Sequence, residues 1–219
     1  MRTALKSNSL HSDSQPNLVP RRPVAIIALH WGTALVGLAV VALILGRELA
    51  DGKAMRALLL DGHRAFGALV LALTLARVAV RIRHHPLSES VDASAAHRLV
   101  IAAMHLALYG LLVAVPVLGW ALTNAHGQPV SVFGLFALPS LLERDSDLAD
   151  TLGDLHETAA WCLVGAVGLH VAAALWHHFV RRDPVLLAML PHGDPAHLRR
   201  ASSSPDLAAI PSESTEAST

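Results

Sequence analysis

The chain has 219 residues, of which 53% are hydrophobic and only 16% are charged, and its formal net charge is zero. Soluble domains carry about 25% charged residues, so this composition predicts a lipid-facing surface. The zero net charge and the 4% aromatic content argue against a nucleic-acid partner. Cys162 is the sole cysteine, which excludes an internal disulfide, a C-x-x-C-H haem attachment site and a four-cysteine iron–sulfur centre within the chain.

Four long apolar runs follow a polar N-terminal segment. They cover about residues 24–46, 63–82, 100–122 and 155–180, and each approaches the ~20 residues that cross a bilayer as a helix. Their apolar character is continuous and not alternating, which indicates helices. The sequence therefore predicts an all-α fold, an integral membrane four-helix up-down bundle over residues 23–182. The polar, Ser- and Pro-containing tails, residues 1–22 and 183–219, are expected to be mostly disordered.

The positions of the basic residues predict the orientation of this bundle. The two tails, the link between the second and third runs and Arg77 carry twelve of the 17 Lys and Arg residues, and the opposite side carries five. Because basic residues concentrate on the cytoplasmic side, both termini are expected in the cytoplasm. The link between the third and fourth runs is then an acidic outer loop, with Glu143, Asp145, Asp147, Asp150 and Asp154.

Histidine is the unusual residue of this hydrophobic chain, which has 14 of them. Ionisable side chains within a membrane are costly and are candidates for function. On the fourth run, His156 and His170 are fourteen residues apart, which is ~21 Å along a helix and within about 40° of the same face. An up-down topology places His30 of the first run level with His170, and His63 of the second run level with His156.

Two imidazoles that face each other at one depth are what a six-coordinate haem iron requires. The four histidines therefore predict two haems, one held by His30 and His170 and the other by His63 and His156. Single metal ions are the main chemical alternative, because imidazole also binds zinc, copper and nickel. The ~21 Å spacing along the helix argues against one shared metal cluster.

Several stretches resemble the bacterial cytochrome b561 family of four-helix di-haem membrane cytochromes. These are I-A-L-H-W at 27–31, D-G-H-R-A-F-G at 61–67, M-H-L-A-L-Y-G-L-L-V-A-V-P-V-L-G-W at 104–120, L-H-E-T-A-A-W at 155–161 and V-G-L-H-V-A-A-A-L-W-H-H at 167–178. The likeness covers roughly residues 20–192. It implies two haem b groups with axial ligands at His30, His63, His156 and His170. It further implies a multi-pass protein of the bacterial inner membrane, an oxidoreductase that exchanges electrons with the quinone pool.

Three further residues are candidates for binding a cofactor. Arg64, beside His63, and Arg77, near the cytoplasmic end of the second run, are positioned to pair with haem propionates. His105 matches a histidine that the family usually has on the third helix, and it is a candidate to hydrogen-bond a quinone carbonyl or a propionate. For each of them a purely structural role, as an interhelical hydrogen-bond partner or an interfacial arginine, stays open.

The sequence leaves the electron donor and acceptor open. Some family members resemble superoxide oxidases, which pass an electron from superoxide to ubiquinone, so ubiquinone is expected as donor or acceptor. Arg47, Lys53, Arg56 and Arg64 at the outer end would attract superoxide, whereas the acidic loop would repel it. Two alternatives remain: a cytochrome b anchor subunit of a separate dehydrogenase, and a non-redox metal-binding or transport protein. The identity of any protein partner is not predicted.

Overall fold

The computed structural model describes residues 23–83, 95–182, 186, 189 and 190, and the expected tails at 1–22 and beyond 190 lie outside that range. The described residues form four long helices, α1 (Val24–Leu49), α2 (Lys53–Arg83), α3 (Ala95–Ala125) and α4 (Ser146–Trp176). A π-helical turn, η1 (His177–Arg181), continues α4, and a short hairpin, β1 (Ser131–Val132) and β2 (Phe136–Ala137), lies between α3 and α4. All four helices belong to one unit, residues 1–189, and a second unit, 190–219, is described only at Leu190.

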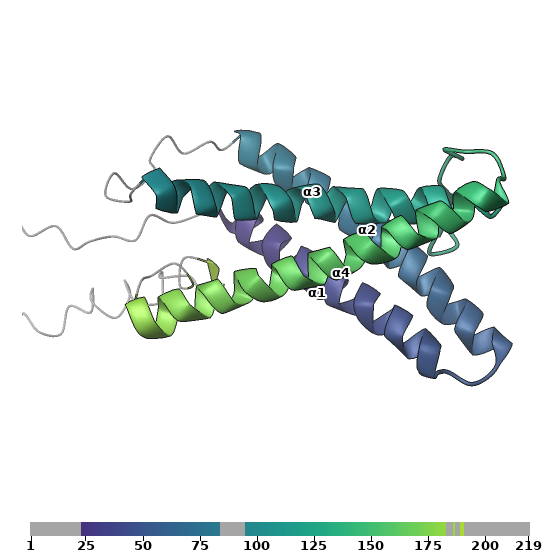
Figure 1. Ribbon diagram of the computed structural model, residues 1–219, viewed down its shortest axis with the longest axis horizontal. Coiled ribbons are helices and arrows are strands. Elements are labelled where there is room, and N and C mark those ends of the chain that lie inside the picture. Colours follow the sequence, from purple (N-terminus) through teal and green to yellow (C-terminus); the bar gives the residue numbers. More distant parts are fainter. Residues whose placement is uncertain (1–22, 84–94, 183–185, 187–188, 191–219) are drawn as a thin grey trace, which may run out of the picture. The chain divides into compact units, whose positions relative to one another are not determined.

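The four helices are long and apolar enough to cross a membrane, as the composition predicts. In the most apolar part of each helix, at most 17% of the residues are buried within the protein, which fits helices whose outward faces contact lipid. Helix α1 packs along α2, α3 packs along α4, and α2 also contacts α3 (Figure 1). We call the end with the α1–α2 turn and the β hairpin the loop end, and the end where α1 begins and α4 finishes the terminal end.

The helices extend further than the apolar runs from which they were predicted. α2 begins ten residues before His63 and α4 begins ten residues before His156, so neither histidine lies at a helix end. The added residues include charged side chains, which end an apolar run in the sequence but do not end a helix. Asp145 caps α4, because its carboxylate accepts hydrogen bonds of 3.1 Å from the amides of Asp147 and Leu148.

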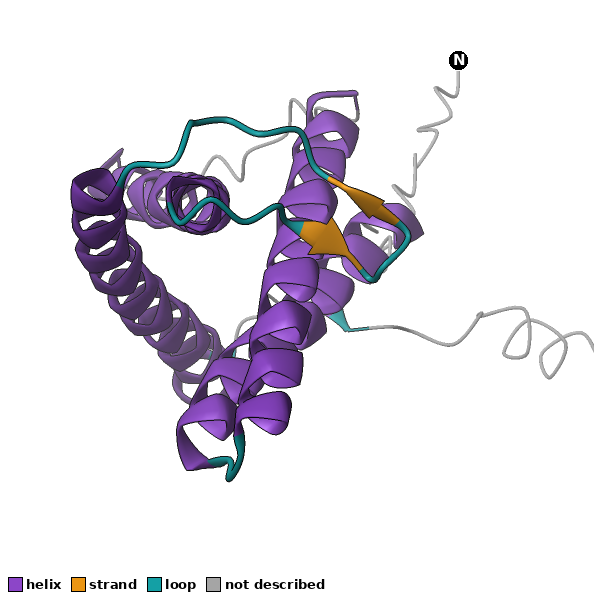
Figure 2. Ribbon diagram, turned by 90° about the vertical axis from the view of Figure 1, so that its right-hand side faces the viewer, coloured by secondary structure: helices purple, strands orange, loops and turns teal. Residues whose placement is uncertain are grey.

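The connection between α3 and α4 is ordered, although the sequence predicts only an acidic loop there. β1 pairs with β2 through a turn in which Phe133 and Gly134 have positive φ angles of 53° and 73°. The hairpin lies beside the helices at the loop end (Figure 2), where β1 packs against α2. The ring of Phe133 lies 5.1 Å from that of Phe66. The loop therefore links the α3–α4 pair to α2 at the loop end.

Side chains of α3 hold this loop. The buried Asn124 donates to the carbonyl oxygen of Gln128 at 3.0 Å and accepts from the amide of Leu141 at 2.9 Å. Trp120 Nε1 donates to the carbonyl oxygen of Pro139 at 3.1 Å. A small core of Ala125, Ala149 and Leu152 lies beside these bonds, so the α3–α4 pair is most closely packed at the loop end.

Candidate functional site

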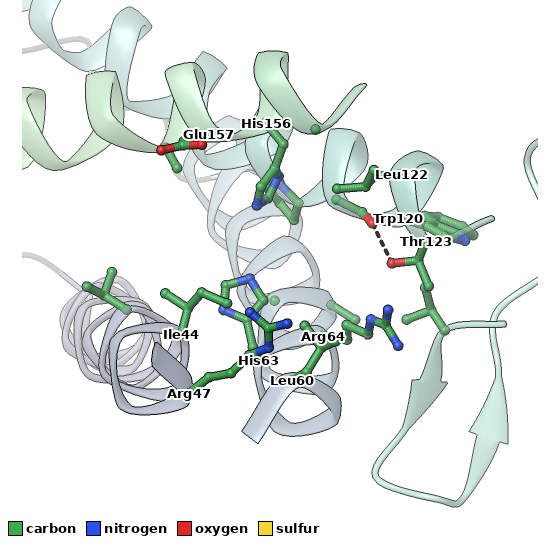
Figure 3. A pocket seen from close by; sticks show the side chains of 18 of the residues that line it. Ile44, Arg47, Leu60, His63, Arg64, Trp120, Leu122, Thr123, His156 and Glu157 are labelled. Carbon is green, nitrogen blue, oxygen red and sulfur yellow. Dashed lines mark hydrogen bonds between the residues drawn. The ribbon is translucent and has the colours of Figure 1, made fainter. Parts of the chain in front are cut away.

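His63 of α2 and His156 of α4 point into one cavity at the loop end (Figure 3). Their ring centres are 6.2 Å apart, and the ring planes are nearly perpendicular, at 82°. Counting residues along each helix predicts that these two histidines lie at the same depth, and the structure places their rings next to each other. We call them the loop-end pair.

Both rings of the loop-end pair are oriented by backbone carbonyls. Nδ1 of His63 lies 3.0 Å from the carbonyl oxygen of Val40 on α1, and Nδ1 of His156 lies 3.0 Å from that of Val115 on α3. In this contact Nδ1–H donates, which leaves the lone pair at Nε2 directed away from the backbone. A histidine that binds a metal is held in this way by a second partner, which fixes both its tautomer and its ring orientation.

The cavity between these rings has a volume of about 630 Å³, within the range of pockets that enclose a cofactor or ligand. Small residues allow the opening between the helices, since Gly67, Ala68, Gly119, Gly153 and Ala160 all line it. Besides the two histidines and Trp120, its polar lining groups are Arg47, Glu48, Arg64, Thr123, His126 and Glu157. Val130 and Leu138 come from the ordered loop, which thus forms one wall of the cavity.

His30 of α1 and His170 of α4 form a second pair toward the terminal end, the terminal-end pair. Their ring centres are 6.4 Å apart, with an interplanar angle of 81°. The two pairs thus have nearly the same geometry at two depths of one bundle. His30 Nδ1 is buried and has no hydrogen-bond partner among the described residues, unlike the Nδ1 atoms of the loop-end pair.

His105 of α3 lies beside the terminal-end pair. Its ring centre is 5.9 Å from that of His170, and its Nδ1 donates to the carbonyl oxygen of Ile101 at 2.8 Å. This places a third imidazole at the terminal-end site, at a position that the sequence analysis associates with a quinone carbonyl or a propionate. His105 therefore contacts His170 within the bundle.

The two candidate arginines lie one at each site. Arg64 lines the loop-end cavity, and its guanidinium is 3.5 Å from the carboxylate of Asp61, one turn before it. Arg77 lies over the ring of Tyr109, with Cζ 5.4 Å from the ring centre, and is close enough to His30 and His170 to interact electrostatically with both. Each arginine therefore adjoins the histidine pair that the sequence assigns to it.

Met189, beyond the end of η1, contacts α1. Trp31 Nε1 donates to the carbonyl oxygen of Met189 at 2.7 Å, and the indole edge contacts the ring of His30, with centres 5.6 Å apart. Met189 belongs to the stretch that the sequence analysis assigns to the C-terminal tail. Its apolar neighbours in the sequence are the signal that could have indicated this contact.

Other residues near the sites carried weaker signals in the sequence. Tyr109 is the sole tyrosine of the chain and follows His105 by one helical turn, but its contact with Arg77 depends on how α2 and α3 pack. His177, at the terminal end, has its ring centre 5.9 Å from that of His97. The carbonyl acceptors at Val40 and Val115 belong to the backbone, so the identity of these residues does not indicate them.

The donor set of both pairs suits a haem iron. Two imidazoles that bind one metal from opposite sides have ring centres about 6 Å apart, because a metal–imidazole bond is about 2.0 Å long. The measured 6.2 and 6.4 Å agree with this separation. No group of three or more His, Cys, Asp and Glu side chains suited to a metal ion occurs among the described residues, so a compact multi-ligand metal centre is not the better description of that part of the chain.

The described residues thus form four helices apolar enough to cross a membrane, and these carry two opposed imidazole pairs at different depths, as in a membrane-embedded helical bundle. The sequence model of the prokaryotic cytochrome b561 family matches residues 21–192. Two curated relatives of Escherichia coli (strain K12) are cytochrome b561 homolog 2, 34% identical over 177 residues (80% of this chain, 93% of the relative), and cytochrome b561 homolog 1, 30% identical over 168 residues (75% and 94%). A probable superoxide oxidase of Yersinia pestis is 33% identical over 130 residues (59% and 73%). This chain belongs to the prokaryotic cytochrome b561 family, which implies that it binds haem b.

Proposed function

We propose that this chain is a di-haem b cytochrome of the bacterial inner membrane that carries single electrons between the quinone pool and a second partner. The observation that supports it most directly is the pair of matched sites, with imidazole centres 6.2 and 6.4 Å apart. In this proposal His63 and His156 hold one haem iron, and His30 and His170 hold the other. When bound, each haem supplies a centre that gains or loses one electron.

The residues of the chain bind and orient the cofactors. The carbonyl oxygens of Val40 and Val115 accept hydrogen bonds from Nδ1–H of the loop-end pair and so fix both rings. Because the rings are already oriented, they lose little conformational entropy when Nε2 binds a metal. Arg64 and Arg77 pair with carboxylates of the cofactor at their respective ends. His105, which keeps Nε2 available because Nδ1 is bonded to Ile101, hydrogen-bonds a quinone carbonyl or a propionate.

The membrane arrangement is part of the same proposal. Residues 23–182 form the transmembrane domain, both termini are cytoplasmic, and the loop end faces outward, as the distribution of Lys and Arg favours. Two haem sites at different depths then provide a route for electrons across the hydrocarbon core. Ubiquinone is the proposed donor or acceptor.

The first experiment is a count of haem b per chain in detergent-purified protein, by the pyridine haemochrome and reduced-minus-oxidised spectra. Two haem b per chain is the expected result. A folded, haem-supplied preparation that stays colourless would contradict the proposal and favour the non-redox metal-binding or transport alternative. Two haems together with electron exchange only through a co-purified dehydrogenase would favour the anchor-subunit alternative.

Superoxide is the electron donor that we propose as the second partner, beside the quinone. A relative of 33% identity is named a probable superoxide oxidase, and Arg47 and Arg64 line the loop-end cavity, where they would attract a small anion. The reaction balances when two superoxide ions each lose one electron, releasing two molecules of dioxygen, while one ubiquinone takes up two electrons and two protons. Enzymatically generated superoxide should then reduce ubiquinone only in the presence of the haem-loaded protein, and quinone that stays oxidised would contradict this choice of donor.

A further inference from the structure

Arg77 and Tyr109 meet in the interior of the bundle near the terminal-end pair. Arg77 Cζ lies 5.4 Å from the centre of the Tyr109 ring, a distance at which a guanidinium is attracted to the ring face. Arg77 follows His63 by fourteen residues on α2, as His170 follows His156 on α4. Because fourteen residues return a helix to within about 40° of the same face, Arg77 is on the face of α2 that bears His63.

The hydroxyl of Tyr109 is a buried polar group that the described protein does not satisfy. Its oxygen is buried and has no hydrogen-bond partner among the described residues. Buried tyrosine hydroxyls nearly always have a hydrogen-bond partner, because a buried hydroxyl without one costs roughly 1–3 kcal/mol of stability. A group that joins the protein on cofactor binding is therefore the natural acceptor for this O–H.

The charges near this hydroxyl indicate that the acceptor is an anion. Every carboxylate of the four helices lies in their loop-end halves, at Glu48, Asp61, Asp147, Asp150, Asp154 and Glu157. The terminal-end halves carry arginines and no carboxylate, with Arg77, Arg81, Arg83 and Arg98, and η1 adds Arg181. The described helices therefore contribute only positive side-chain charge at this end, and a low-dielectric interior strengthens the attraction of Arg77 for a negative group.

We propose that Tyr109 and Arg77 together bind a propionate carboxylate of the haem held by His30 and His170. The Tyr109 O–H donates to one carboxylate oxygen, and the Arg77 guanidinium, held against the ring face, forms a charge-assisted hydrogen bond with the carboxylate. This inference rests on the proposed function, because it needs a haem at the terminal-end pair. It adds Tyr109 as a binding residue, and it gives the contact between Arg77 and the ring a positioning role.

The sole tyrosine of the chain makes a site-specific test possible. Protein that contains ring-labelled tyrosine is compared in the oxidised and reduced states by infrared difference spectroscopy, so that every labelled band belongs to Tyr109. We expect a shift of the tyrosine C–O band when the terminal-end haem changes its charge, and loss of that band in Tyr109→Phe. Tyr109→Phe keeps the ring under Arg77 and removes only the donor.

Redox titration of the same variants provides the second readout. Loss of the donor leaves the carboxylate more negative, which stabilises the ferric state, so Tyr109→Phe should lower the midpoint potential of the terminal-end haem alone. Arg77→Gln should lower it further and release part of that haem, and Arg77→Lys should restore haem retention in part. Arg81→Gln, four residues further along α2, is the matched control and should leave both the band and the haem content unchanged.

The outcomes separate this inference from the proposed function. Two haems per chain with an insensitive tyrosine band and unchanged potentials in Tyr109→Phe would overturn the carboxylate site and leave the cytochrome proposal intact. A tyrosine band that responds to added ubiquinone and not to haem reduction would also overturn it, in favour of a quinone contact. Wild-type protein without haem would overturn both.

Discussion

The ring of His156 lies directly against Gly119 of α3. A Cβ atom at position 119 would be 2.9 Å from Cε1 of this histidine, closer than real Cβ contacts occur, and 3.2 Å from its Nδ1. The lack of a side chain is what lets the imidazole reach the carbonyl oxygen of Val115, 3.0 Å from Nδ1. The glycine is therefore needed for close approach, and not for an unusual backbone angle.

Replacing Gly119 with alanine should displace His156 and weaken binding at the loop-end site. We expect Gly119→Ala to lose the spectral component of that haem while it keeps the terminal-end component, as measured by reduced-minus-oxidised spectra. The matched control on the same helix is Gly110→Ala, where a Cβ meets nothing within 4 Å and where alanine favours the helix by about 1 kcal/mol. Two intact components in Gly119→Ala would show that the ring does not need this approach.

The pairing of the histidines predicts which single replacements behave alike. His30→Ala and His170→Ala should remove one spectral component, because loss of either ligand leaves the same iron without its second imidazole. His63→Ala and His156→Ala should remove the other. Redox-resolved spectra of the four variants provide the measurement, and depletion of one common component by His30→Ala and His63→Ala would refute the pairing.

Arg64 should raise the midpoint potential of the loop-end haem, because a nearby cation disfavours the more positive ferric state. We expect Arg64→Gln to lower this potential by tens of mV, on the order expected for a partly screened charge within several ångströms. Arg56→Gln is the control, since Arg56 donates to the carbonyl oxygen of Ala50 and is not among the cavity-lining residues. Equal shifts in both variants would point to a general surface-charge effect.

The hydrogen bond from Trp31 to Met189 should hold the segment after α4 against α1. Trp31→Phe keeps an aromatic ring beside His30 and removes the indole N–H, a bond of about 0.5–1.5 kcal/mol. Chymotryptic cleavage after Leu186 or Met189 should then become about two- to tenfold faster. Trp176→Phe, which alters a mostly exposed indole (60%), is the matched control, and an unchanged cleavage rate in Trp31→Phe would argue that the bond does not restrain the segment.

Asn124 should stabilise the loop that forms a wall of the loop-end cavity. Asn124→Ala removes the acceptor for the Leu141 amide and the donor to Gln128, with an expected cost of roughly 1–3 kcal/mol because the freed groups are partly buried. Hydrogen exchange at the Leu141 amide should be faster by one to two orders of magnitude. Ser140→Ala removes an exposed hydroxyl that donates to Leu142, so it should leave this exchange rate nearly unchanged.

Much of the terminal-end and loop-end geometry could be predicted from spacing. Fourteen residues separate His156 from His170, and an antiparallel bundle makes His63 level with the first and His30 level with the second. The structure places the rings of these residues opposite one another, at 6.2 and 6.4 Å. Each residue adds a fixed rise along a helix, so the depth of a side chain can be counted from the sequence without knowledge of the neighbouring helices.

The partners of these rings could not be predicted in the same way. The contacts of His156 with Gly119 and Val115, and that of Arg77 with Tyr109, depend on how far each helix is rotated and how closely it approaches the next. The bond between Trp31 and Met189 joins residues 158 positions apart. No local sequence pattern predicts such a contact, because the two residues meet only when the helices have packed.

The sequence by itself thus determined the membrane-spanning helices and the depth of each histidine, because hydrophobicity and helical rise are properties of one segment at a time. The tertiary structure alone decided the cavity, the ordered loop over it and the carbonyls that orient the imidazoles. Backbone carbonyls have no residue-specific signature, and a cavity is the space between surfaces that several segments share. Rotation and close approach of packed helices are properties of the assembled bundle, and they decide which atoms of this chain can hold a cofactor.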